Sequence, residues 1–218
     1  MSKLILIFLL GLSLQINAQQ RPTIKNGLES FVRANTIYPM YAKENCIQGS
    51  IEIAFKINKE GKVTYASITK GIGADLDAEA LRLIKLTSGK WTVPTGYDTT
   101  FLIRSPMKFS LQDYGCEQLN PGSMGLAIKQ YNDDMTSLSK IANFYRNREN
   151  GTENFIEEET IIALKNEMGV DDEYLNKKIA IAEKKISQGD LQSACEDFKF
   201  VKYMGSTKAD KLLAKYCK

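Results

Sequence analysis

Ile51-Glu52-Ile53-Ala54-Phe55-Lys56-Ile57 is the stretch of sequence that decides the fold, because a large apolar residue stands at every second position. Successive side chains of a β-strand point to opposite faces, so this alternation predicts a strand with one buried and one largely polar face. Asn58-Lys59-Glu60-Gly61 follows, and Gly61 can adopt the positive φ that a short hairpin loop requires. We therefore expect a β-hairpin here.

The second strand of the hairpin is predicted to run through Val63, Tyr65 and Ile68. Ile68 has the opposite parity to the other two, so we expect a bulge near it or an early end to the pairing. A helix is expected next, because Asp75-Leu76-Asp77 places acidic residues where a helix N-terminus favours them. Its apolar residues recur at helical spacing: Leu76, Ala80, Leu83 and Ile84.

A third strand is predicted from Phe101 to Leu111. Its inward positions share one parity: Phe101, Ile103, Met107, Phe109 and Leu111. Pro106 cannot donate a ladder hydrogen bond, which places this strand at a sheet edge. A helical crossover makes the third strand parallel to the second, so the first strand is central. The expected fold class is α+β, with an N-terminal ββαβ antiparallel three-stranded sheet domain and an all-α C-terminal helical domain.

The N-terminal segment resembles the C-terminal domain of the TonB family over roughly residues 29 to 112. The resemblance rests on short motifs whose order and spacing fit together. They are Tyr38-Pro39 with Ala42, Gln48-Gly49 before Ile51-Glu52-Ile53-Ala54-Phe55, Glu60-Gly61-Lys62-Val63, Leu76-Asp77 with Ala80, Lys90-Trp91 with Pro94, and Pro106-Met107-Lys108-Phe109.

This resemblance implies a module that binds an extended segment of an outer-membrane TonB-dependent transporter, added as a strand to the third-strand edge. The family's other contacts lie at and before the Tyr-Pro pair, which here are Asn35, Thr36, Ile37 and Tyr38. On the edge strand the expected partner-binding residues are Arg104, Pro106, Lys108 and Ser110. An open edge can also pair two copies, so a homodimer is a further expectation.

Residues 1–18 are expected to be a signal peptide that is cleaved after Ala18. Its apolar run from Leu4 to Leu14 is shorter than the about 20 residues of a membrane-spanning helix. The predicted location is the periplasm. The alternative is an uncleaved N-terminus at the inner membrane, facing the periplasm. Residues 19–37 contain one proline, whereas the resemblance implies a long proline-rich spacer for an energy transducer.

Residues 115–218 are predicted to form a helical domain separate from the sheet domain at residues 19–114, because the apolar period changes to about 3.6. Helices are expected to begin at Asp133-Asp134, Phe155 and Asp171-Asp172. Residues 175–205 resemble one tetratricopeptide-like repeat through Ile181-Ala182, Gly189-Asp190-Leu191, Ala194 and Phe198. A solenoid needs about three stacked repeats, so a generic helical bundle is the alternative.

The four cysteines are expected to form disulfides in an oxidising compartment. Cys195 and Cys217 are each eleven residues from a turn at Ser206, which sets them at the same height on facing helices. Cys46 precedes the first strand and Cys116 follows the third, and antiparallel neighbours bring those ends together. The predicted pairs are Cys46–Cys116 and Cys195–Cys217, and free thiols are the alternative.

The chain of 218 residues contains no histidine, which excludes histidine-based catalytic triads and the commonest zinc ligand. Its acidic pairs fit helix capping, so we expect no enzyme, no metal site, no cofactor and no small-molecule substrate. Residues 19–114 have 13 basic and 9 acidic side chains, whereas residues 115–218 have 15 and 17. Without a basic stripe interleaved with aromatics, nucleic acid is not an expected partner.

Three functions therefore stay open. The first is an exported, non-enzymatic periplasmic module that binds an extended peptide of an outer-membrane transporter or another envelope partner. The second is a membrane-anchored TonB-type energy transducer for transmembrane transport. The third is a structural envelope protein whose sheet edges are covered by its own C-terminal half, with no peptide site.

Overall fold

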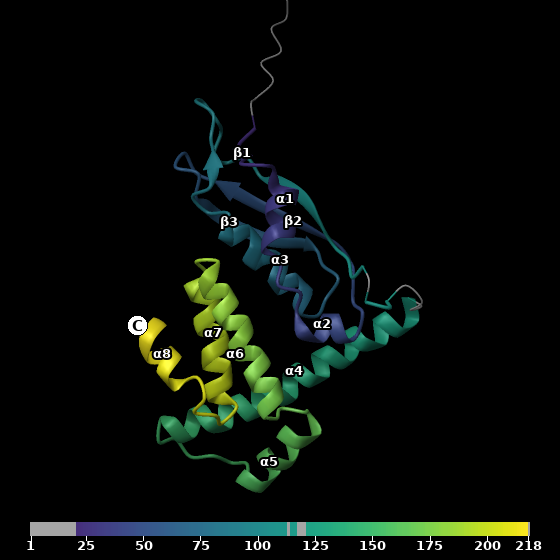
Figure 1. Ribbon diagram of the computed structural model, residues 1–218, viewed down its shortest axis with the longest axis vertical. Helices are drawn as coiled ribbons and strands as arrows, with labels where there is room; N and C mark the ends of the chain where they lie inside the picture. The colour runs from purple at the N-terminus through teal and green to yellow at the C-terminus, as the bar shows by residue number, and fades with distance from the viewer. Residues whose placement is uncertain (1–20, 113, 117–120, 218) are drawn as a thin grey trace, which may run out of the picture.

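The computed structural model describes residues 21–112, 114–116 and 121–217, so the predicted signal peptide lies outside the described residues. A small sheet module comes first and a set of helices follows it (Figure 1). The elements of the module are β1 (Thr23–Ile24), α1 (Leu28–Asn35), α2 (Met40–Glu44), β2 (Gly49–Ile57), β3 (Val63–Lys70), α3 (Asp75–Leu86), β4 (Trp91–Thr92) and β5 (Ile103–Phe109).

The main sheet has the strand order β3-β2-β5, and β2 is antiparallel to both of its neighbours. β5 therefore runs parallel to β3, as a crossover through α3 requires. This arrangement confirms the α+β class, the central position of the first strand of the hairpin and the outer position of the strand with Pro106. A further sheet pairs β1 with β4, and these two-residue strands are too short to produce a sequence pattern.

The β2–β3 pairing contains two register shifts, one between Glu52 and Ile53 and one between Lys56 and Ile57. On β3 they leave Thr69 and Thr64 without an opposite residue. The irregularity expected near Ile68 is present, and the pairing continues beyond it.

The outer strand β5 is shorter than the sequence predicted. Phe101 lies before it and is 42% exposed, so its expected inward position was wrong. A turn explains this, because the Asp98 carboxylate accepts from the backbone N–H of Thr100 at 2.8 Å and from its hydroxyl at 2.7 Å. Strand pairing starts only after that turn, at Ile103.

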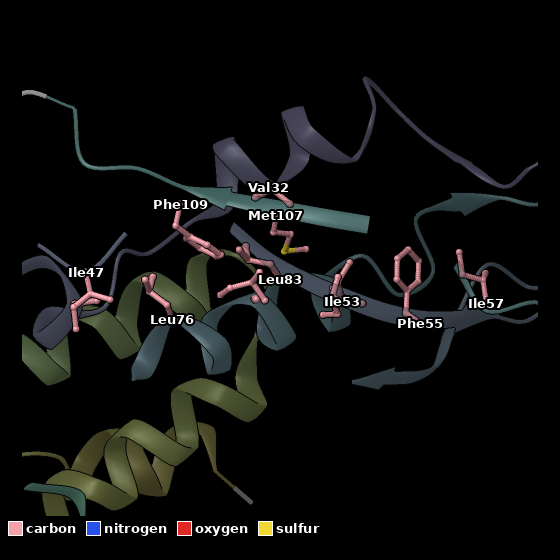
Figure 2. Packing of buried hydrophobic residues seen from close by; sticks show 13 residues of the cluster. Val32, Ile47, Ile53, Phe55, Ile57, Leu76, Leu83, Met107 and Phe109 are labelled. Atoms are coloured by element: carbon pink, nitrogen blue, oxygen red, sulfur yellow. The ribbon is translucent and has the colours of Figure 1, made fainter. Parts of the chain in front are cut away.

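The core of the module lies between one face of the main sheet and α3, and α1 and α2 complete it (Figure 2). Leu76 and Leu83 of α3 and Val32 of α1 point into the same cluster as Met107 of β5. The odd-numbered residues of β2 supply the other wall and are fully buried: Ile51, Ile53, Phe55 and Ile57. Burial of each of these large apolar side chains stabilises the fold by roughly 1.5–3 kcal/mol.

The second half of the chain is helical, as expected. Its elements are α4 (Pro121–Glu149), α5 (Glu158–Glu167), α6 (Asp172–Ser187), α7 (Leu191–Tyr203) and α8 (Asp210–Tyr216). Its own apolar core includes Ile141, Phe198 and Met204. The helices α6 and α7 form an antiparallel hairpin, capped by Asp171, whose carboxylate accepts from Tyr174 N, and by Asp190, which accepts from Ser193 N (Figure 1). The tetratricopeptide-like character of this hairpin stays a prediction.

Two predicted helix starts were wrong. Asp133-Asp134 lies inside α4, because that helix already begins at Pro121, and proline is favoured at a first helical position. The first part of α4 packs its apolar residues Met124, Ala127 and Ile128 against the core of the sheet module. Phe155 lies before α5 and is 94% exposed, and Glu157 is the residue that precedes the first turn of that helix.

Both expected disulfides, Cys46–Cys116 and Cys195–Cys217, are present, with Cα–Cα distances of 5.5 and 5.6 Å. The first closes the sheet module where β5 leaves it, and the second joins α7 to the end of α8. None of the described helices combines the length and the apolar character needed to cross a bilayer.

Candidate functional site

The outer edge of β5 is the first candidate for a functional site. The carbonyl oxygens of Glu52 and Lys56 accept from the hydroxyls of Thr69 and Thr64, so the even-numbered residues of β2 direct their backbone groups to β3. Backbone directions alternate along a strand, and the odd-numbered residues of β2 therefore bond to β5. Their opposite residues are Ile103, Ser105, Met107 and Phe109.

The remaining residues of β5 direct their backbone groups away from the sheet. These residues are Arg104, Pro106 and Lys108, and the edge therefore offers two N–H donors and three carbonyl acceptors. No described residue outside the sheet makes a backbone hydrogen bond to β5. The Ser105 hydroxyl approaches the Pro106 carbonyl at 3.4 Å. This edge is thus available for a further strand.

The side chains of the predicted edge residues are also accessible. Arg104, Pro106, Lys108 and Ser110 are all exposed. The neighbouring odd-numbered residues Met107 and Phe109 are 2% and 3% exposed and belong to the core. The structure therefore separates an outward row of polar residues and one proline from an inward apolar row. Their role in partner binding stays a prediction.

The other predicted contact residues, Asn35, Thr36, Ile37 and Tyr38, are occupied within the chain. Ile37 is 7% exposed, and its backbone N–H donates to Glu79 Oε1 at 2.8 Å. The Thr36 hydroxyl donates to Val32 O at 2.8 Å and caps α1. These contacts fix the backbone that leads into the Tyr-Pro pair.

Tyr38 connects this segment to β5. Its hydroxyl donates to Ile47 O at 2.6 Å, and its ring packs edge-on against Phe109 with a centroid distance of 6.3 Å. Burial, followed by the negative charge of Asp75, raises the pKa of Tyr38 to about 12. The phenol is therefore a fixed hydrogen-bond donor at neutral pH, beside the last residue of the edge strand.

Arg82 of α3 is the centre of a buried polar network that sequence reasoning missed. Its guanidinium donates to both carboxylate oxygens of Glu79, at 2.7 and 2.8 Å, and to the carbonyl oxygen of Asn35, at 2.9 Å. It also donates to Gln188 Oε1 at 2.9 Å and to Asp190 Oδ2 at 3.1 Å, both between α6 and α7. All five N–H groups of the guanidinium are satisfied.

The network joins the helical half to the predicted contact segment. Gln188 Nε2 donates to the same Asn35 carbonyl at 2.9 Å, so this oxygen accepts two hydrogen bonds. Burial alone would lower the pKa of Arg82, but the hydrogen bonds and charges of Glu79 and Asp190 outweigh it and raise the pKa. The local sequence does not distinguish this arginine from a solvated one, since Gln188 and Asp190, its partners in the helical half, lie more than a hundred residues away.

A cavity of about 690 Å³ lies between the two halves, lined by residues of α2, α3, α4, α6 and α7. Asp75 faces it, and the buried Oδ1 of this carboxylate has no hydrogen-bond partner. Burial raises the pKa of Asp75 to about 6, against the opposing effect of nearby backbone N–H groups and of Lys178. Burial and then the charge of Asp75 raise the pKa of Tyr131 and Tyr174 to about 12. The described residues contain no group of His, Cys, Asp and Glu suited to a metal ion.

Comparison with known proteins identifies the sheet module. Residues 34–111 match the family model of the Gram-negative bacterial TonB protein C-terminal region. This segment is a TonB C-terminal domain. The resemblance drawn from the motifs is thereby confirmed, and the matched residues include both groups of predicted contact residues.

The TonB C-terminal domain accounts for part of the chain. The chain is 30% identical over 96 residues to Protein TonB of Haemophilus influenzae, and the aligned part covers 44% of this chain. The chain spans only about a third (33%) of the length of that relative. A comparison with solved structures finds no match. The helical half, from α4 onward, lies outside the family match.

Proposed function

We propose that the TonB C-terminal domain of this protein binds an extended peptide of an outer-membrane transporter, or of another envelope partner, by adding it as a strand to β5. The protein then acts in the periplasm as a non-enzymatic adaptor. Main-chain hydrogen bonds give affinity in this mode of recognition, and the flanking side chains select the sequence.

The unpaired edge of β5 is the observation that carries this proposal. The backbone groups of Arg104 and Lys108 point away from β2, and no described residue pairs with them. The alternative of an edge covered by the C-terminal half finds no support, because the helices contact α2, α3 and the Asn35 carbonyl instead. The open edge thus favours peptide capture over a purely structural role.

Substitution of Arg104 tests the proposal. Arg104→Pro removes an outward N–H donor, whereas Arg104→Ala keeps that donor and removes the same side chain. One net hydrogen bond contributes about 1 kcal/mol, so Arg104→Pro should bind transporter-derived peptides roughly fivefold more weakly than Arg104→Ala. Fluorescence anisotropy with labelled peptides measures the difference. Equal affinities of the two variants, with unchanged thermal stability, would refute strand addition at this edge.

The likeness to Protein TonB favours a second candidate function, an energy transducer that is held at the inner membrane by its N-terminus. The two candidates differ in the mature N-terminus. Mass spectrometry of the protein purified from envelopes decides between them: a chain that begins at Gln19 supports the periplasmic adaptor, and an intact residue 1 supports the anchored transducer.

A further inference from the structure

The charges of the main sheet are strongly one-sided. The three strands carry four cations, Lys56, Lys70, Arg104 and Lys108, against the single carboxylate of Glu52. On the outer strand itself the charged side chains are Arg104 and Lys108. Both are exposed, and neither takes part in any ion pair found among the described residues.

Arg104 and Lys108 are four residues apart, so their side chains project from the same face of β5. Their separation along the strand is about 13 Å at roughly 3.3 Å per residue. Both residues belong to the outward set whose backbone groups are unpaired. A strand that pairs with β5 therefore sets one of its own residues directly opposite each cation, with Cβ atoms about 4.5–5.5 Å apart.

A second copy of the chain is a poor occupant of this edge. Antiparallel pairing of two β5 strands about Pro106 sets Arg104 of each copy opposite Lys108 of the other, so that two pairs of like charges meet. Like charges directly opposite each other destabilise a pair of strands. Pro106 also lacks the N–H that the central pair would exchange. Lysine and proline are residues that protect edge strands from self-association.

We infer that the strand captured by β5 carries two carboxylates four residues apart, which pair with Arg104 and Lys108. This inference rests on the proposed function and adds the chemistry of the partner. The same two cations that repel a second β5 attract an acidic strand, so one feature of the edge excludes self-pairing and selects the partner.

Pro106 lacks a backbone N–H, so an added strand can form fewer main-chain hydrogen bonds to β5. Side-chain contacts therefore contribute a larger part of the binding free energy. The edge offers N–H groups at Arg104 and Lys108, and between them the partner's carbonyl finds no donor. The main-chain ladder is therefore interrupted at its centre, between the two cations. Ion pairs at both ends of the interruption hold the added strand in register, because a slip by one residue moves both carboxylates to the opposite face.

Synthetic peptides test the inference on the full mature protein. The probe has nine residues, alternating Thr and Val, with Glu at positions three and seven; the matched peptides carry Gln or Lys at those two positions. A cross-strand charge pair contributes roughly 0.2–1 kcal/mol, so the Glu peptide should bind about fivefold more tightly than the Gln peptide. The Lys peptide should bind more than tenfold more weakly than the Glu peptide. The preference should shrink as salt is raised from 50 to about 500 mM.

Charge reversal supplies the second arm. The double variant Arg104→Glu with Lys108→Glu should reverse the order, so that the Lys peptide binds best. Lys70→Glu on the opposite edge strand is the matched control and should leave the order unchanged. Both variants change exposed side chains, and circular dichroism checks that they fold.

Each outcome separates the inference from the proposed function. Equal binding of all three peptides, weakened by Arg104→Pro, would retain strand addition and overturn the acidic preference. A Glu peptide that binds the double variant as tightly as the wild type would also overturn it. Failure of every peptide to bind would refute the proposed function itself. A dimer in sedimentation that Arg104→Pro abolishes, by removing an outward N–H donor, would identify a second copy as the occupant and overturn the inference.

Discussion

The guanidinium of Arg82 donates a hydrogen bond to the carboxylate of Asp190 at 3.1 Å, although the two residues are 108 positions apart in the chain. Arg82 belongs to the helix that covers the sheet, and Asp190 caps the second helix of the α6–α7 hairpin. Both side chains are largely buried, at 6% and 11% exposure. The contact makes the TonB C-terminal domain and the helical half energetically dependent on one another.

Replacement of Arg82 should therefore destabilise both halves. Arg82→Met leaves Glu79 and Asp190 as buried charges without their counter-ion, and breaking a buried pair in this way costs about 3–5 kcal/mol. Urea denaturation measures the loss. Arg33→Met, at an exposed position of α1, is the matched control and should change stability by less than about 0.5 kcal/mol. A stable Arg82→Met protein would contradict the role of the network.

The same substitution should release the segment before the Tyr-Pro pair. The Asn35 carbonyl loses one of its two donors, and the Glu79 carboxylate that holds Ile37 N–H loses its counter-ion. Hydrogen exchange followed by mass spectrometry should show faster exchange at residues 35–37, with no change in the peptide that covers β3. Unaltered exchange at residues 35–37 would show that α3 alone fixes this segment.

The amide groups of β5 should fall into two classes. Ser105 and Met107 donate toward β2 and should exchange slowly, whereas Arg104 and Lys108 point to solvent and should exchange faster by at least a hundredfold, which corresponds to about 2.7 kcal/mol. Amide exchange measured by NMR resolves these four residues individually. Protection of all four before any partner is added would mean that the edge is already covered.

The two disulfides should contribute unequally to stability. Cys195–Cys217 closes a separation of 22 residues and Cys46–Cys116 one of 70, for which loop entropy gives about 3 and about 4 kcal/mol. Paired Cys→Ala substitutions, one bridge at a time, should therefore lower the free energy of unfolding by about these amounts. A protein that keeps its full stability after loss of both bridges would contradict this assignment.

The raised pKa of Asp75 predicts an unusual dependence on pH. Its value of about 6 in the folded chain exceeds the ordinary 3.8, so the ionised carboxylate disfavours the folded state. Ionisation of Asp75 therefore lowers the free energy of unfolding, by about 3 kcal/mol at most, and this effect is complete above about pH 6. It disappears below about pH 4, where the carboxyl is protonated in both states. Asp75→Asn should therefore stabilise the protein at pH 7 and lose this advantage as the pH falls to 4. Denaturation midpoints of both proteins across this range test it, and a constant difference would count against it.

The sheet module was predictable because its signals are local. Alternation in residues 51–57, the turn at Gly61 and the acidic start at Asp75 each act within a few positions, and together they determine strand order. The strand pairing then brings Cys46 beside Cys116, so that bridge followed from topology alone.

The parts that sequence reasoning missed depend on contacts between distant segments. The first turns of α4, before the predicted start at Asp133-Asp134, pack Ala127 and Ile128 against the sheet module. Because this contact joins distant segments, the local sequence pattern did not predict the earlier helix start. The network around Arg82 is complete only when the α6–α7 hairpin lies against α3, because Gln188 and Asp190 supply two of its acceptors. The candidate edge was therefore foreseen, whereas the occupation of Asn35, Thr36 and Ile37 was not.

The Cys46–Cys116 bridge also determines how the protein resists a pulling force. Along the covalent chain, tension applied to the helical half reaches the sheet module at Cys116, seven residues beyond the end of β5. Without the bridge this load would peel β5 away from β2 one hydrogen bond at a time. With the bridge, the covalent link to Cys46 carries the load to the segment just before β2. The hydrogen bonds between β5 and β2 then bear little of the force.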